Sequence, residues 1–145
     1  MNQSILALAA LLCITLLAYN VQKQGIERDR WSLRAEVEAQ AATLGAKLLD
    51  AAASAPLFGG GTQGQALGRG LPLADWEGRR DTVNVPFDRG ELQFVVLADV
   101  DTVQKHGQEF VVSPLPSPYY RLRLDIEGPL DTRAQMERVY TRSHR

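Results

Sequence analysis

The feature that most constrains this chain is an uncharged, mostly apolar run near its start. Residues 5–21 read ILALAALLCITLLAYNV and hold no Asp, Glu, Lys or Arg. At about 1.5 Å per residue, a helix of this length spans roughly 25 Å, close to the ~30 Å hydrocarbon core of a bilayer. The run lacks the basic n-region and the A-x-A cleavage site of a secretory signal peptide. We therefore expect it to serve as an anchor or an assembly surface.

Residues 22–54 continue this helix as an amphipathic segment. They contain no Pro, and their apolar residues recur three, four or seven positions apart, as on one face of a helix. This stripe comprises Ile26, Leu33, Val37, Ala41, Leu44, Leu48 and Ala52. Pro56 and the glycines after it end the pattern. The simplest structure is one helix of about 50 residues, roughly 75 Å long. Gly25, where apolar sequence gives way to amphipathic sequence, is a candidate joint in it.

The segment 56–81 is rich in Gly and is expected to be a connecting loop. The residues expected to pin it on the domain are Leu71, Leu73 and Trp76. A G-x-G-x-x-G pattern occurs at Gly59, Gly61 and Gly64, but it cradles a pyrophosphate only between a strand and a helix N-terminus. A helix is predicted before it and more Gly follows, so no nucleotide site is predicted.

From Thr82 onward the hydrophobic period changes to two, which predicts β-strands. Five strands are expected, at residues 82–87, 91–104, 109–115, 118–128 and 134–142. In the fourth strand, Tyr120, Leu122, Leu124 and Ile126 alternate with charged residues. This alternation indicates a sheet with one covered face and one face in water.

The apolar stripe of the long helix is the obvious cover for the apolar face of the sheet. The predicted fold class is α+β, with a long N-terminal α-helix packed on a small antiparallel β-sheet. The residues expected to pack on the sheet are Ile26, Leu33, Val37, Leu44 and Leu48. The predicted segments are an apolar helix half (1–25), an amphipathic helix half (26–55), a glycine-rich loop (56–81) and an antiparallel sheet domain (82–145).

Composition argues against several classes of function. The formal net charge is −1 at pH 7, which gives no basic footprint for binding phosphates, so nucleic acid is not an expected partner. The single cysteine, Cys13, lies inside the apolar run and cannot form an internal disulfide. We interpret it as a small apolar residue of the helix.

No catalytic, cofactor-binding or metal site is predicted, and the chain is not expected to be an enzyme. His106 lies in a predicted turn and His144 lies next to the last residue, so no nucleophile and base can be paired from their spacing. Asp99 and Asp101 form a D-x-D pattern, but the residues after them do not continue a calcium loop. We interpret both as carboxylates on the solvated face of a strand.

The arginines of the last strands leave two interpretations open. Arg121, Arg123, Arg138 and Arg142 would either mark a surface for an anionic ligand or form a solvated sheet face. Asp125, Glu127 and Glu137 stand close by in the same strands. Because opposite charges pair across neighbouring strands, the solvated face is the favoured interpretation.

The order of these parts resembles that of a type IV pilin or pseudopilin. SILALAALLCITLLAYNV resembles the apolar helix half of that family, and EVEAQAATLGAKLLDAAASAPLF resembles the helix end of its minor pilins. FVVLADV and YYRLRLDIEG resemble its sheet strands. The family's basic leader before a Phe-Thr-Leu-Ile-Glu start does not occur, and Ile5 stands where the family has a glutamate. The resemblance implies an assembly role for the helix, over Ile5 to Val21.

The function expected from these observations is that of a structural subunit of an extracellular or envelope pilus-like filament, assembled through bundled N-terminal helices. Its partners would be copies of itself or related pilin-like subunits, with inner-membrane anchoring before assembly and a cell-surface filament afterwards. No cofactor is expected. The expected assembly interface comprises Ile5, Leu6, Leu8, Leu11, Leu12, Ile14, Leu16, Leu17, Tyr19 and Val21.

Two alternatives from other classes remain open at the level of sequence. The chain could be a single-pass membrane adaptor with a short coiled coil and a small periplasmic β domain. It could also be a membrane-tethered binding module that uses the glycine-rich loop. A filament subunit needs an apolar helix half that is contacted on all sides, whereas an adaptor needs only one seam.

Overall fold

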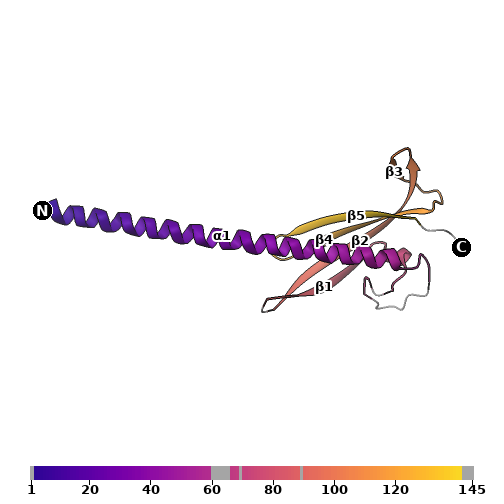
Figure 1. The fold of residues 1–145 in the computed structure, drawn as a ribbon, viewed down its shortest axis with the longest axis horizontal. Coiled ribbons are helices and arrows are strands. Elements are labelled where there is room, and N and C mark those ends of the chain that lie inside the picture. Colours follow the sequence, from indigo (N-terminus) through magenta and orange to yellow (C-terminus); the bar gives the residue numbers. More distant parts are fainter. Residues whose placement is uncertain (1, 60–65, 69, 89, 142–145) are drawn as a thin grey trace. The chain divides into compact units, whose positions relative to one another are not determined.

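The computed structural model describes residues 2–59, 66–68, 70–88 and 90–141, with side chains from Ile5 onward (Figure 1). Its elements are α1 (Asn2–Ser54), the 3₁₀ helix η1 (Leu73–Trp76), β1 (Arg79–Phe87), β2 (Gly90–His106), β3 (Glu109–Val112), β4 (Tyr119–Glu127) and β5 (Arg133–Thr141). A long helix packed on five antiparallel strands confirms the α+β prediction. The chain divides into two compact units, Met1–Glu36 and Val37–Arg145, and each is described by itself.

The five strands form one sheet. Four of them follow the order β1-β2-β4-β5, and β3 joins the sheet by pairing with β2. The long strand β2 pairs with β1 along its first half, and with β3 only over Val103 to His106. Residues that lie directly opposite one another in an antiparallel sheet share a face. Arg80, Leu97, Asp125 and Gln135 are opposite one another on four successive strands, so they form one row across the outer face.

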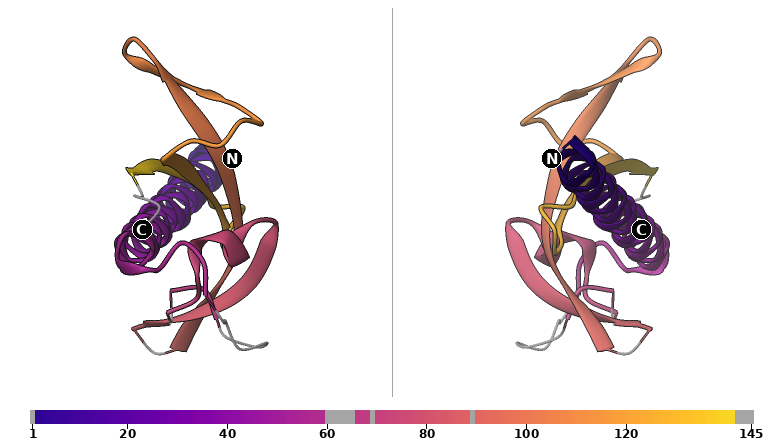
Figure 2. Two further views of the ribbon diagram at one scale, coloured as in Figure 1. Left: turned by 90° about the vertical axis from the view of Figure 1, so that its right-hand side faces the viewer. Right: turned by 90° about the vertical axis from the view of Figure 1, so that its left-hand side faces the viewer.

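The hydrophobic core lies between the last five turns of α1 and the inner face of the sheet. Figure 2 shows this part of the helix running along one face of the strands. The helix contributes Val37, Ala41, Leu44, Leu48 and Ala52, and the sheet contributes Phe94, Val96, Leu122, Leu124 and Ile126. All of these residues are buried, as the alternating pattern of a half-covered sheet requires.

The sequence places the start of the packed stripe too early. Val37, Leu44 and Leu48 are buried, but Ile26 and Leu33, which were expected to pack on the sheet, are 57% and 41% exposed. The physical reason is length. A nine-residue strand such as β4 spans about 30 Å, which is matched by only about 20 residues of helix. The hydrophobic periodicity shows that the helix has an apolar stripe, but it does not show how much of that stripe the sheet covers.

Polar contacts tie the end of α1 to β5. The Tyr140 hydroxyl donates a hydrogen bond of 2.6 Å to the carbonyl oxygen of Leu49, in a buried position. Next to it, the Arg138 guanidinium lies 2.8 Å from the Asp50 carboxylate, and this hydrogen bond raises the pKa of Arg138 above its ordinary value. These bonds are directional, so they set the register of the helix against the sheet in a way that apolar contact alone does not.

The segment predicted as a loop is ordered by specific bonds at its described ends. The Leu73 amide donates to the carbonyl of Pro56 at 2.8 Å, and the Trp76 indole donates to the carbonyl of Leu71 at 3.0 Å. The Asp81 carboxylate accepts from the Leu67 amide at 2.8 Å. Leu71, Leu73 and Trp76 are buried, and β1 begins at Arg79, inside the range 56–81 predicted as loop. Gly61 and Gly64 of the G-x-G-x-x-G pattern, for which no site was predicted, lie outside the described residues.

The first prediction concerns the close approach of helix and sheet at Gly45. A Cβ atom there would lie 2.5 Å from the Met136 sulfur and 3.0 Å from Ile126 Cδ1. Gly45→Val should therefore overpack the core and lower the free energy of unfolding by about 1–3 kcal/mol, measured by urea denaturation of the full chain in mild detergent. Gly25→Val is the matched control, because a Cβ at Gly25 meets nothing within 4 Å. Equal stability of the two variants would contradict the packing described here.

The second prediction concerns Gly25, which lies inside α1 without interrupting it. The expected joint at this glycine stays a prediction. Because Gly lowers helix stability by about 1 kcal/mol relative to Ala, amides of residues 22–25 should exchange with solvent faster than those of residues 14–17. Hydrogen exchange on the assembled protein, read by mass spectrometry, measures this directly. Protection that is uniform along α1 would mean that the joint does not exist.

Candidate functional site

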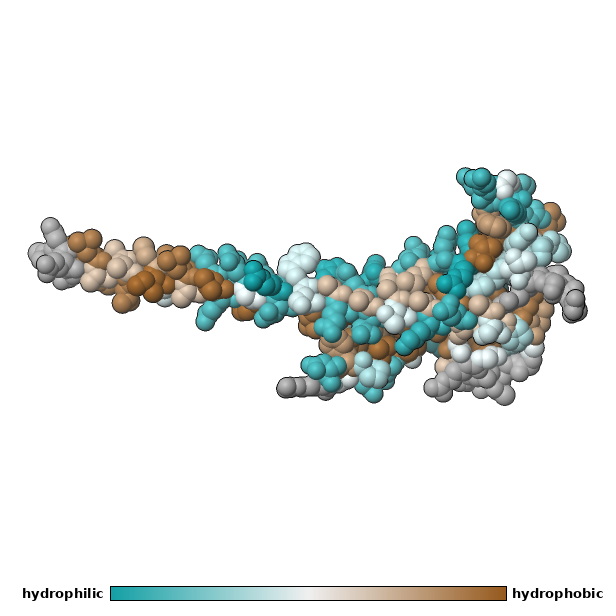
Figure 3. Space-filling model, viewed as in Figure 1, coloured by the Kyte–Doolittle hydropathy of each residue, from teal (hydrophilic) through white to brown (hydrophobic). Residues whose placement is uncertain are grey.

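The largest exposed apolar surface belongs to the first half of α1. Its members are Ile5, Leu6, Leu8, Leu11, Leu12, Ile14, Leu16, Leu17, Tyr19 and Val21, and each is between 56% and 69% exposed. Successive residues turn by about 100° around a helix, so these side chains point in all directions. Figure 3 shows the apolar residues gathered on this part of the helix, followed by a strongly hydrophilic stretch.

This surface has the dimensions of a membrane-spanning segment. Among the described residues, α1 is the one helix that is long and apolar enough to cross a membrane. Cys13 is exposed on it and makes no disulfide within the described chain. A helix that is apolar on every side is stable only where lipid or other protein covers it.

The residues that sequence reasoning considered for chemistry are not brought together. His106 is exposed at the end of β2, and the Asp101 carboxylate forms an ion pair with Arg121 at 2.9 Å. No group of three or more His, Cys, Asp or Glu side chains that could hold a metal ion occurs in the described ranges. His144 and Arg142 lie outside these ranges.

Some charged residues of the sheet pair with one another across strands. Arg123 lies 4.0 Å from Glu137, and Arg133 lies 3.7 Å from Glu127. Pairs this exposed contribute about 0–1 kcal/mol each. Arg138 does not lie on the solvated face where it was predicted. It lies in the inner-face register and pairs with Asp50 of the helix. Periodicity alone did not reveal a partner that is 88 residues away in the sequence.

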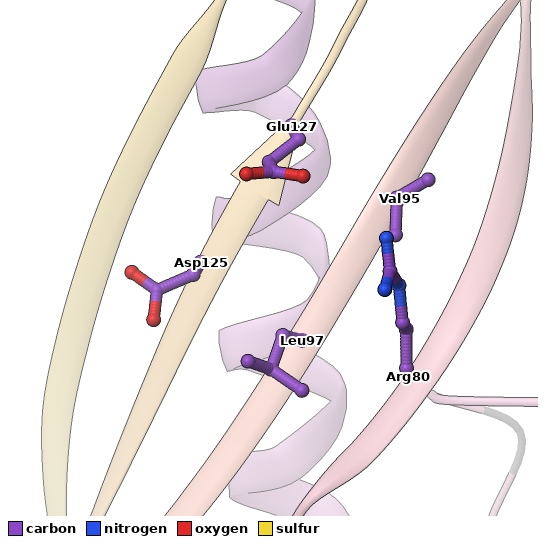
Figure 4. A pocket seen from close by; sticks show the side chains of 5 residues that line it. All are labelled: Arg80, Val95, Leu97, Asp125 and Glu127. Carbon is purple, nitrogen blue, oxygen red and sulfur yellow. The ribbon is translucent and has the colours of Figure 1, made fainter.

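Sequence reasoning missed a shallow hollow on the outer face of the sheet, which we call the sheet groove. It has a volume of about 200 Å³ and is lined by Arg80, Val95, Leu97, Asp125 and Glu127. Figure 4 shows Leu97 between Arg80 on one side and the Asp125 and Glu127 carboxylates on the other, with Val95 next to the end of the Arg80 side chain. The signal was present in the sequence, since the run FVVLA in β2 is apolar on both faces.

Comparison with known proteins assigns no family to this chain. No protein-family model, curated protein or solved structure matches this chain. The function has to be argued from the surfaces just described, which are the apolar half of α1 and the outer face of the sheet.

The third prediction follows from the separation of these surfaces. A chain that lacks residues 1–25 should remain soluble and monomeric with its sheet intact, because the core residues all lie from Val37 onward. The full chain should require detergent or lipid, because its exposed apolar helix half is retained. Circular dichroism and light scattering of both proteins make the comparison. A shortened chain that unfolds or still polymerises would show that residues 1–25 support the fold or that the association surface lies elsewhere.

Proposed function

We propose that this protein is a non-enzymatic structural subunit of a pilus-like filament. Its first helix half would bundle with the same segment of other copies in the filament core, and its sheet domain would form the outside. The partners are further copies of the chain or related pilin-like subunits. Before assembly the same helix half would anchor the subunit in a membrane, and the assembled filament would stand on the cell surface.

The observation that carries this proposal is the all-round exposure of residues 5–21. Covering a Leu or Ile side chain stabilises a structure by about 1.5–3 kcal/mol, and ten large apolar side chains of this segment are uncovered in the single chain. Lipid covers a helix from all sides, and so does a bundle of several helices. A subunit that passes from membrane to filament exchanges one cover for the other with little loss of apolar burial.

The sheet domain supports a structural role in a second way. Its core is complete within one chain, since helix residues from Val37 onward cover the inner face of the sheet. A domain that folds on its own leaves the apolar helix half free for association.

A second candidate function, a single-pass membrane adaptor with a short coiled coil, is favoured by one feature. Tyr19, Ile26 and Leu33 are exposed and lie seven residues apart, so they form a seam along one face of α1. Heptad spacing of this kind is typical of pairing with one other helix. The seam continues beyond the apolar run into the charged part of the helix, where lipid would not cover it. In this reading the sheet domain would lie in the periplasm.

The fourth prediction tests the filament directly. Leu12 lies in the middle of the apolar run, and Leu12→Arg should abolish assembly while leaving the sheet domain folded. An Arg at the centre of a membrane-spanning helix costs about 2.5–3.5 kcal/mol on insertion scales. In a packed bundle the unpaired charge recurs at every subunit and has no water within reach. Negative-stain microscopy of material sheared from cells, probed with an antibody against residues 56–145, shows whether filaments form.

Two further variants separate the candidates and control for added charge. Gln24→Arg adds the same charge outside the apolar run and should leave assembly unchanged. Leu17 is nine residues from Ile26, so it lies about 180° from the seam. Leu17→Arg should block a filament, in which every face is packed, but should spare an adaptor that uses only the seam. Filaments of ordinary appearance from the Leu12→Arg protein would show that this helix half is not the assembly core.

A further inference from the structure

The four-strand path of the sheet ends in two open edges, β1 on one side and β5 on the other (Figure 1). Both edge strands are nine residues long. In the part of the chain that the structure describes, β1 pairs with β2 alone and β5 pairs with β4 alone. An open edge presents a row of backbone N–H and C=O groups that can bind a further strand.

The β5 edge has few of the features that keep an edge strand from pairing. It contains no Pro, Gly or Lys, and its register against β4 is continuous over all nine residues, without a bulge. Its one charge on the inner face, Arg138, is paired with Asp50. The β1 edge carries one such feature, Pro86, at its next-to-last residue. Long edges without bulges or prolines favour the addition of another strand.

The strand directions decide how two copies can meet. Each neighbouring pair along the path β1-β2-β4-β5 is antiparallel, so β5 runs opposite to β1. Copies that point the same way in a filament therefore bring β5 of one beside β1 of the next in antiparallel orientation. Antiparallel pairing of two β5 strands would instead require one copy to be reversed.

The backbone groups at the two edges also match. In an antiparallel strand, each residue directs its N–H and C=O to one side, and successive residues alternate. Pro86 has no N–H, and a proline in an edge strand directs that side to solvent. Arg80, six residues earlier, therefore also directs its groups away from β2. Bonded and non-bonded pairs alternate along the row from Arg80 to Gln135, so Gln135 directs its groups away from β4.

The side chains favour one register between the two edges. With Gln135 opposite Asn84, two exposed amides meet on the outer face. Met136 then lies opposite Val83 on the inner face. Both are only partly buried in the single chain, so the added strand would cover them further.

Charges exclude the neighbouring registers. In the register of Gln135 with Asn84, Arg138 lies opposite Asp81, and no other charged residue of either strand has a charge directly opposite. A shift of two residues in one direction places Arg138 opposite Arg79, and a shift in the other direction places it opposite Val83. Arg138 and Asp81 already have partners in their own chain, so their pairing adds selectivity rather than affinity.

We propose that β5 of one copy pairs with β1 of the next copy, with Gln135 opposite Asn84, so that the sheets of neighbouring subunits form one continuous antiparallel sheet. Two different edges meet in this contact, so it is heterologous and repeats along an open polymer. A stable interface buries about 800 Å² on each partner, which is more than one strand edge supplies. The contact therefore acts together with the bundled helices, and this inference rests on the proposed filament function.

Disulfide cross-linking in filaments tests the contact. The background is Cys13→Ser, which removes the single native cysteine. Asn84→Cys and Gln135→Cys are combined in one full-length chain, and filaments sheared from cells are mildly oxidised. Within one chain the two strands are three strand spacings apart, roughly 14 Å, and a disulfide needs Cα atoms within about 7 Å. A bond therefore reports a contact between copies, and we expect a ladder of covalent dimers, trimers and longer species on a non-reducing gel.

The matched control pairs Gln135→Cys with Arg80→Cys. Arg80 is exposed on the same face of β1 as Asn84 and lies four residues away, about 13 Å along the strand. This control should give no ladder. Mixing copies that carry only Asn84→Cys with copies that carry only Gln135→Cys should stop the ladder at dimers. Gln135→Cys alone should give no covalent dimer.

A proline tests whether backbone bonds hold the two edges together. Glu137 is two residues from Gln135, so its N–H also points away from β4. Glu137→Pro removes this N–H and should lower the cross-linked fraction of the Asn84→Cys, Gln135→Cys chain about fivefold, while the bonds to β4 remain. Glu137→Thr removes the same carboxylate but keeps the N–H, and should leave the ladder unchanged. Circular dichroism of both variants checks that the sheet is folded.

The outcomes separate the contact from the function. Filaments that form without a ladder, or that cross-link equally through Arg80→Cys, overturn the pairing in this register and leave the filament function standing. Covalent dimers from Gln135→Cys alone would show that two β5 edges pair with each other instead. A ladder that survives Glu137→Pro, or a sheet that this variant unfolds, overturns the backbone pairing. The absence of filaments from the unsubstituted protein overturns the proposed function, and the contact with it.

Discussion

The structure depends on the packing of the last five turns of α1 against the inner face of a five-stranded sheet. A small antiparallel sheet exposes half of its side chains on each face, and it is stable only if one face is covered. Residues from Val37 to Ala52 provide this cover, and Tyr140 and Arg138 of β5 fix its register through bonds to the helix. Gly45 lets the helix backbone come close to Met136 and Ile126 at this contact.

This packing also determines which surfaces are left for other molecules. Strand β4 is as long as about 20 helical residues, and the helix residues of the described core are those from Val37 to Ala52. The first half of the helix then presents apolar side chains in every direction. On the other side of the domain, the outer sheet face retains an apolar row between charges in the sheet groove. Both surfaces are consequences of covering one face of the sheet with only part of a longer helix.

Electrostatics has a secondary part in the fold and a larger one at the surface. The cross-strand ion pairs are partly or largely exposed, and pairs of this kind add little to stability. They pair only part of the charges of the outer face. Charges of this kind contribute orientation and selectivity to an association whose free energy comes mainly from apolar burial.

The sequence by itself determined the fold class, the long helix and the existence of the five strands, but not the 3₁₀ helix η1 or the start of β1 at Arg79. Residues 22–54 have helical periodicity, residues 2–54 contain no proline, and β4 alternates apolar and charged residues, so local pattern was sufficient for both. Only the tertiary structure decided that Ile26 and Leu33 lie outside the packed stripe, that Arg138 bonds to Asp50, and that Val95 and Leu97 form the floor of a groove. These features depend on the length of the sheet and on contacts between residues far apart in the chain, which hydrophobic periodicity does not encode.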